Sequence, residues 1–286
     1  MITKYLDPKN DVAFRKIFGT EKNKDILMHF LNDMAMFKDN PSIVDIEFLK
    51  TIQDPEIASK KTSIVDILCK DKSGRQYIVE MQVAHDKGFA ERAQYYASKA
   101  YINQANVGDQ YHNLREVVFL AITDFVMFPN RASFKSDHII LEKDTYDHDL
   151  KHLAFSFLEL PKFTKTIHQL ENITDKWMYF FKYCKKTSES DVAAIVGNDS
   201  IIERAYNELN RFNWSEIEMN TYEQEEKHER DHLSLMGSKY DEGWEKRGEK
   251  IARKLLDMGM SVEDVHKGTG LSIEKIKHLT SVTEGL

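Results

Sequence analysis

The sequence is poor in cysteine and has no long hydrophobic run. Its two cysteines, Cys69 and Cys184, are too few for a disulfide framework, and Cys69 lies inside an apolar segment, which indicates a reducing compartment. No stretch approaches the roughly 20 apolar residues that a membrane-spanning helix needs, and residues 1–10, MITKYLDPKN, do not resemble a signal peptide. We therefore expect a cytoplasmic protein with no membrane partner.

The sequence also lacks an excess of basic residues. It has 40 Lys and Arg against 47 Asp and Glu, a net charge of -7, which argues against a protein that coats nucleic acid. A local basic groove remains compatible with this charge. With 286 residues, 41% of them hydrophobic, the chain is long enough for a sizeable core and a smaller unit.

The most informative stretch is residues 63–83, SIVDILCKDKSGRQYIVEMQV. Two apolar halves flank the segment DKSGR, whose glycine favours the left-handed conformation of short hairpin loops. Because both halves are apolar at consecutive positions, they predict two strands that are covered on both faces and lie inside a sheet. Three polar residues interrupt the apolar pattern, Asp66, Glu80 and Gln82.

The length of the hairpin loop decides how these polar residues face one another. A three-residue loop pairs Asp71 with Arg75. Asp66 then lies opposite Glu80, with Gln82 on the same face, whereas a four-residue loop separates the two acids. Facing carboxylates repel by roughly 1 kcal/mol in water and about 4 kcal/mol at an effective dielectric near 20. Mg²⁺ would offset this repulsion; a protonated carboxylate or a nearby Lys or Arg is the alternative.

The spacing of Asp66, Glu80 and Gln82 resembles the catalytic hairpin of the PD-(D/E)XK nucleases. More narrowly, the chain resembles the Rpn family of recombination-promoting nucleases, which is grouped with transposases. Two positions depart from the superfamily pattern: Val65 replaces the proline of PD, and Gln82 replaces the usual catalytic lysine, although Gln is expected there in the Rpn group. The other segments that carry the resemblance are residues 7–11 (DPKND), 14–19 (FRKIFG), 31–32 (LN), Arg92 with Tyr95 and Tyr96, and residues 159–163 (ELPKF).

The resemblance implies an α/β fold, with a PD-(D/E)XK restriction-endonuclease-like core whose mixed central β-sheet is flanked by helices, and with an α-helical C-terminal region. It implies a metal-dependent DNA endonuclease linked to recombination, transposition or phage defence. Asp66, Glu80 and the Met81 carbonyl would hold Mg²⁺, or alternatively Mn²⁺ or Ca²⁺, and Asp11 would aid a first or second ion. Gln82 would orient the attacking water. The rival interpretation is a nuclease-derived DNA- or protein-binding module that has lost catalysis, against which the intact acid pair argues.

Two helices are expected to carry further site residues. Asp7 as N-cap, followed by proline, predicts a first helix that ends at Gly19 and carries Asp11 and Lys16. Asp11 alternatively pairs with Arg15 at i,i+4.

A second such helix spans residues 88–107. In related nucleases the helix after the hairpin lies against the site, so Arg92, Tyr96 and Lys99 are candidate DNA-binding residues together with Lys16. An ordinary amphipathic helix explains the same pattern equally well.

The remaining segments predict a mixed sheet with flanking helices. Strands are expected over residues 43–50, 116–125, 138–141 and 153–160, and a helix over residues 22–36. Residues 185–200 indicate a flexible connection, and Ser200 with Glu203 predicts a helix that continues to Phe212. We expect a nuclease-like core at 1–184, a helical extension at 185–242 and a small helical tail at 243–286.

Two features of the C-terminal half suggest other functions. Residues 228–232 (HERDH) match the H-E-x-x-H zinc-peptidase pattern, but their strongly polar surroundings favour a solvated helix over a dry zinc site. Ser261 and Ser272 begin two short helices whose pattern resembles a helix-turn-helix. Residues 243–286 contain eight Lys and Arg against seven Asp and Glu, so a regulatory or protein-interaction tail is as well supported as a DNA reader. Double-strand cutting would be simplest for a homodimer.

Overall fold

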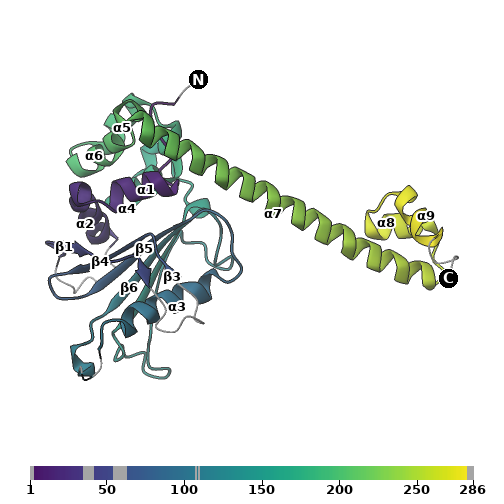
Figure 1. The fold of residues 1–286 in the computed structure, drawn as a ribbon, viewed down its shortest axis with the longest axis horizontal. Coiled ribbons are helices and arrows are strands. Elements are labelled where there is room, and N and C mark those ends of the chain that lie inside the picture. The colour runs from purple at the N-terminus through teal and green to yellow at the C-terminus, as the bar shows by residue number, and fades with distance from the viewer. Residues whose placement is uncertain (1–2, 35–41, 54–62, 107, 109, 282–286) are drawn as a thin grey trace. The chain divides into compact units, whose positions relative to one another are not determined.

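The computed structural model describes residues 3–34, 42–53, 63–106, 108 and 110–281. The chain divides into two compact units, residues 1–225 and 226–286. The first unit holds all the strands of the described chain (Figure 1).

The first unit is built on a mixed six-stranded sheet. Its order is β1 (Ile46–Phe48), β4 (Ile67–Asp71), β5 (Gln76–Gln82), β6 (Val117–Thr123), β8 (Leu153–Glu159) and β7 (Lys135–Ile139). Strands β5, β6 and β8 run parallel to one another. Strand β4 pairs antiparallel with both β1 and β5, and β7 pairs antiparallel with β8. Strands β2 (Ile52–Gln53) and β3 (Ser63–Ile64) form a separate pair. The α/β class and the mixed sheet predicted from the sequence are confirmed.

The register of the central hairpin is the one that a three-residue loop predicts. Lys70 pairs with Gln76 and Ile67 with Val79, and Gly74 adopts the left-handed conformation with φ of +85°. Asp71 closes the loop, since its side chain accepts hydrogen bonds from the backbone N–H of Ser73 (2.8 Å) and Arg75 (3.1 Å). Strands β4 and β5 lie inside the sheet, as their apolar composition predicts.

Helices cover both faces of this sheet (Figure 1). Alternate strand residues, among them Val79 and Leu120, pack in the larger core with α1 (Asp11–Phe18), α2 (Lys24–Asp33), α4 (Ile173–Tyr183), α5 (Glu189–Val196) and α6 (Ser200–Glu208). The intervening residues, among them Ile78 and Phe119, pack against α3 (Phe89–Ile102). The buried stripe of α3 is Phe89 followed by the small residues Ala93, Ala97 and Ala100, which let the helix lie close to the strands.

Short 3₁₀ helices join these elements: η1 (Glu21–Asn23), η2 (Tyr111–Asn113), η3 (Leu160–Lys162), η4 (Ile167–Gln169), η5 (Cys184–Lys186) and η6 (Arg211–Asn213).

Two helix starts differ from the sequence prediction. The N-cap of α1 is Asn10 rather than Asp7, because the Asn10 side chain accepts from the N–H of Val12 and Ala13. The predicted C-cap, Gly19, is confirmed, since its N–H donates to Arg15 O. The N-cap of α6 is Asp199 rather than Ser200, and α6 ends at Glu208, before η6.

Three further boundaries are corrected. The segment predicted as a flexible connection contains helix α5, which is capped by Ser188 and buries Val192, Ile195 and Val196. The sequence pattern did not predict this helix because its apolar face is only two turns long. Helix α2 begins later than predicted and α3 ends at Ile102; the predicted ends at residues 36 and 107 lie outside the described residues.

The C-terminal helices begin with α7 (Glu216–Asp257), whose first turns belong to the first unit. In the second unit, α8 (Val262–Thr269) and α9 (Ile273–Ser281) pack with the end of α7, as predicted, around a core of Ala252, Val265, Leu271, Ile276 and Leu279. None of the helices that the structure describes is both long and apolar enough to span a membrane.

Candidate active site

Two carboxylates lie close together at the end of the central hairpin opposite its loop. Asp66 directly precedes β4, and its backbone N–H donates to Glu80 Oε1 at 3.2 Å. The backbone N–H of Met81 donates in turn to Asp66 Oδ2 at 3.0 Å. The two acids therefore face each other, as the register predicts, and the backbone of each strand fixes the carboxylate of the other.

A third carboxylate, Asp11, comes from the first turn of α1. Burial, followed by the charge of Asp66, raises the pKa of Asp11 to about 6. Glu80 is only 6% exposed; burial, with the charges of Asp66 and Asp11, raises its pKa well above the usual value. Asp66 and Glu80 are therefore linked by hydrogen bonds, and Asp11 lies within electrostatic range of both.

Arg15 contacts this acid cluster, but not through the residue that the sequence suggested. Its guanidinium donates to Asp66 Oδ1 at 3.1 Å instead of forming the alternative i,i+4 pair with Asp11. The Arg15 side chain is 51% exposed, so it can leave the cluster without unpacking the core. Asp11 keeps its raised pKa although the charge of Arg15 lowers it.

Gln82 is held by Arg92, from the helix that follows the hairpin. Arg92 Nη2 donates to Gln82 Oε1 at 2.6 Å, and Gln82 Nε2 donates to Ala84 O at 2.9 Å. Arg92 is itself anchored by Asp86 at 2.9 Å and lies over the Phe89 ring, 4.9 Å from its centre. The Arg92 charge lowers the pKa of the nearby Glu80, so this guanidinium places positive charge beside both residues.

The other candidate DNA-binding residues are placed differently. Tyr96 is half-buried on α3. Burial and the charges of Glu80 and Asp66 raise its pKa, while the charge of Arg92 lowers it, which indicates that Tyr96 lies near the acids. Lys99 follows on the same helix and is half-buried. Lys16 pairs with Glu218, and its ammonium lies 4.3 Å from the centre of the Trp214 ring. The structure thus ties Lys16 to the start of α7, not to the acids.

The acid cluster has the donor chemistry of a divalent-cation site. In the part of the chain that the structure describes, no group of three or more His, Cys, Asp or Glu side chains is placed to hold a metal ion. Mg²⁺ commonly takes only one or two protein carboxylates and fills its other positions with water and substrate phosphate. Asp66 and Glu80, with Asp11 nearby, fit this requirement, and their mutual repulsion is the kind that a cation relieves. A role for the Met81 carbonyl stays a prediction.

Two residues that the sequence did not single out, Lys9 and Asp124, lie at the same edge of the sheet. Lys9 Nζ lies 2.6 Å from Asp124 Oδ2, and the backbone N–H of Asp124 donates to Gln82 O at 3.0 Å. A signal was present, since Asp124 directly follows a buried strand and polar residues at the carboxyl ends of parallel strands often line sites. Lys9 lies in the DPKND segment, where only Asp11 was singled out.

The zinc-peptidase pattern, residues 228–232, lies within α7, as the solvated-helix interpretation predicts. The side chain of His228 is exposed, whereas those of Glu229 and His232 lie outside the described ones.

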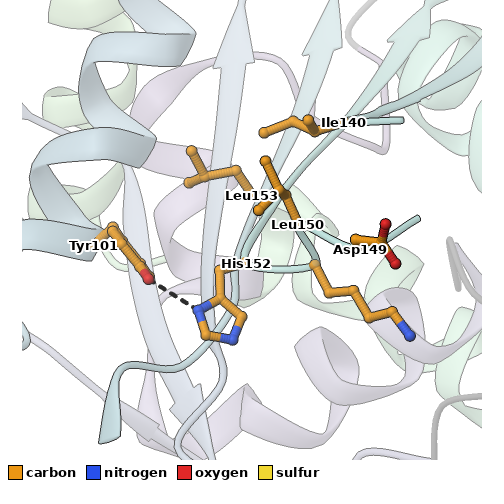
Figure 2. A pocket seen from close by; sticks show the side chains of 7 residues that line it. Tyr101, Ile140, Asp149, Leu150, His152 and Leu153 are labelled. Atoms are coloured by element: carbon orange, nitrogen blue, oxygen red, sulfur yellow. Dashed lines mark hydrogen bonds between the residues drawn. The ribbon is translucent and has the colours of Figure 1, made fainter. Parts of the chain in front are cut away.

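Figure 2 shows a separate cavity of about 380 Å³. Its lining includes Tyr101 and His152, joined by a 2.9 Å hydrogen bond, and Leu153. Leu153 is level with Val117, and Val117 with Gln76. Gln76 lies at the opposite end of β5 from Gln82, about 20 Å away at roughly 3.3 Å per residue. This cavity therefore does not belong to the acid site.

Comparison with known proteins identifies the family. No curated protein and no solved structure matches the chain significantly. A family model described as PD-(D/E)XK nuclease family transposase matches residues 8–238. The matched region contains all three acids, Gln82 and Arg92, and the observed mixed sheet is the one expected of this fold. The chain belongs to the PD-(D/E)XK nuclease family transposases.

Proposed function

We propose that this protein is a divalent-metal-dependent DNA endonuclease that hydrolyses phosphodiester bonds, with Mg²⁺ as its ion and Mn²⁺ or Ca²⁺ as alternatives. The observation that carries the proposal is the convergence of Asp66, Glu80 and Asp11, two of them with raised pKa values, in a chain of a nuclease family. A role in recombination, transposition or phage defence, placement in the Rpn group, a homodimer and a cytoplasmic location belong to the same proposal.

Each residue has a distinct role in this mechanism. Asp66 and Glu80 hold the cation, and Asp11 adds negative charge beside them. A cation held there would lower the pKa of a water molecule and would neutralise charge that develops on the phosphate. Arg15 must give up Asp66 Oδ1 when the cation binds, and its half-exposed side chain allows this.

Gln82 and Arg92 act on the attacking water and the phosphate. The Gln82 amide is fixed at both ends, by Arg92 and by Ala84 O. It keeps a further N–H and a lone pair with which to orient water. Gln82 cannot supply the positive charge of the lysine usual at this position, and the Arg92 guanidinium beside it can. Tyr96 and Lys99 extend this surface along α3 towards the DNA backbone.

The test is incubation of purified protein with supercoiled plasmid in Mg²⁺, Mn²⁺ or Ca²⁺, against EDTA. We expect nicking or linearisation that requires metal and is lost in Asp66→Ala. Asp45→Ala is the matched control, because Asp45 pairs with Lys24 on the surface. Cleavage by Asp66→Ala would refute the site.

A catalytically inactive binding module is the second candidate. The Arg15–Asp66 ion pair favours it, since a permanent arginine contact would compete with a metal. Calorimetric titration with Mn²⁺ separates the two functions: the nuclease binds metal and loses binding in Glu80→Gln, whereas the inactive module binds none. The C-terminal tail, residues 243–286, is proposed to serve protein interaction or regulation, with DNA reading as the equal alternative.

A further inference from the structure

Two lysines from distant parts of the sequence approach one carboxylate at the end of β6. Lys9 Nζ lies 2.6 Å from Asp124 Oδ2. Lys182, on α4, donates to the backbone carbonyls of Phe163 (2.6 Å) and Pro161 (3.3 Å). Burial lowers the pKa of Lys182, Asp124 raises it and Lys9 lowers it further, so all three charges lie close together.

The segment that carries Lys9 is fixed on both sides. The N–H of Leu6 donates to Leu209 O (2.9 Å), and that of Asp7 to the Tyr222 hydroxyl (3.1 Å). The N–H of Lys9 donates to Asp7 Oδ1 (3.1 Å). The ammonium therefore stands on a rigid support, which reduces the entropy that a ligand contact would cost.

This positive group is adjacent to the acid site. Asp124 is hydrogen-bonded through its backbone N–H to Gln82 O (3.0 Å), and Lys9 is two residues before Asp11. The Lys9 side chain is 19% exposed, so its ammonium is held in place but keeps access to solvent. The ion pair of Lys22 with Glu208 is more distant from Asp11 in sequence.

We infer that Lys9 binds a backbone phosphate of the nucleic-acid substrate, with Asp124 positioning its ammonium and Lys182 adding positive potential. The inference rests on the proposed function, in that the substrate is DNA. A lysine ammonium binds phosphate as a point charge and has three donors, so one can stay on Asp124. The carboxylates of the site repel a phosphate, and a fixed cation beside Gln82 offsets this repulsion without displacing the metal.

The experiment measures binding of a fluorescent duplex oligonucleotide by anisotropy in Ca²⁺ at about 50 to 200 mM salt. Each phosphate contact contributes about 0.9 to the salt slope. Across this fourfold salt range, the fold-loss of DNA affinity should therefore be smaller in Lys9→Gln than in the wild type, by a factor of about 3.5. Lys9→Arg should keep the slope, and Asp124→Asn should bind as tightly as the wild type or more tightly, because Lys9 loses a competing anion. Lys22→Met is the control and should match the wild type.

Two results would overturn the inference, given variants that keep the wild-type circular dichroism spectrum. One is an unchanged salt slope in Lys9→Gln. The other is equal loss of affinity in Lys9→Gln and Asp124→Asn, which would make the pair merely structural. A wild type that shows the Lys9-dependent slope but does not cleave plasmid would support the inference while refuting the endonuclease. Cleavage by a wild type whose binding is indifferent to Lys9 would do the reverse.

Discussion

Replacing Asp11 by Asn should stabilise the metal-free protein while it impairs cleavage. Burial and the charge of Asp66 raise the pKa of Asp11 from 3.8 to about 6, so the folded state disfavours the ionised form. At about 1.36 kcal/mol per pH unit this difference is worth at most about 3 kcal/mol. Asp11 keeps part of its surface in water, and screening reduces the expected gain to about 1–2 kcal/mol.

The sign of the pH dependence follows from the raised pKa. Below pH 3.8 Asp11 is protonated in both folded and unfolded chains and costs nothing. As the pH rises to about 6 the unfolded chain ionises first, so the free energy of unfolding of the wild type falls. Above pH 6 the full cost is present, and Asp11→Asn avoids it.

Thermal unfolding in EDTA between pH 4 and pH 8 measures this difference. At about 2–4 °C per kcal/mol for a domain of this size, Asp11→Asn should melt about 2–8 °C above the wild type at pH 8 and coincide with it near pH 4. Asp45→Asn is the matched control and should show no gain, because Lys24 already lowers the pKa of Asp45. Equal melting temperatures of Asp11→Asn and wild type at pH 8 would show that the acids are not mutually destabilising.

Further predictions concern cleavage of supercoiled plasmid. Asp66→Ala and Glu80→Ala should abolish it, because each removes a carboxylate that holds the cation; residual metal-dependent nicking by either would contradict the site. At limiting Mg²⁺ the wild-type rate should rise as the pH increases through about 6, where Asp11 ionises, and a flat profile would remove Asp11 from the mechanism. Gln82→Lys should keep activity, because the ammonium supplies the positive charge of the usual lysine. Arg92→Met should lower the cleavage rate about 10- to 100-fold when residue 82 is Gln, and less when it is combined with Gln82→Lys. Equal loss in both backgrounds would show that the two residues act independently.

The hairpin illustrates how far local sequence rules reach. Its apolar halves, the glycine of the loop and the side-chain period of two predict the hairpin but allow two registers, and the observed register sets Asp66 opposite Glu80. Helices α1 and α3 were also predicted, but the buried stripe of α3, formed by Phe89 and small residues, was not. Helix α5 was not predicted, since its short apolar face gives too few repeats to distinguish it from a loop.

Contacts between distant segments lay beyond these rules. The sequence offered Arg15 as a partner for Asp11 four residues away, but the fold directs it to Asp66, 51 residues away. It offered Lys16 as a DNA-binding residue, and the fold pairs it with Glu218, 202 residues away. The alternative ion pairs of a long side chain differ little in free energy, so the pair that forms depends on how whole helices pack.

The sequence by itself determined the two strands of the hairpin, because these follow from side-chain periodicity, and its family resemblance indicated the carboxylates; it left two loop lengths, and therefore two registers, open. Tertiary structure alone decided that Asp11 joins the acids, that Arg92 holds Gln82, and that Lys9 lies beside Asp124. The reason is physical: each of these contacts joins elements whose relative position is set by the packing of α1 and α3 on the sheet, and neither spacing nor propensity along the chain encodes that position.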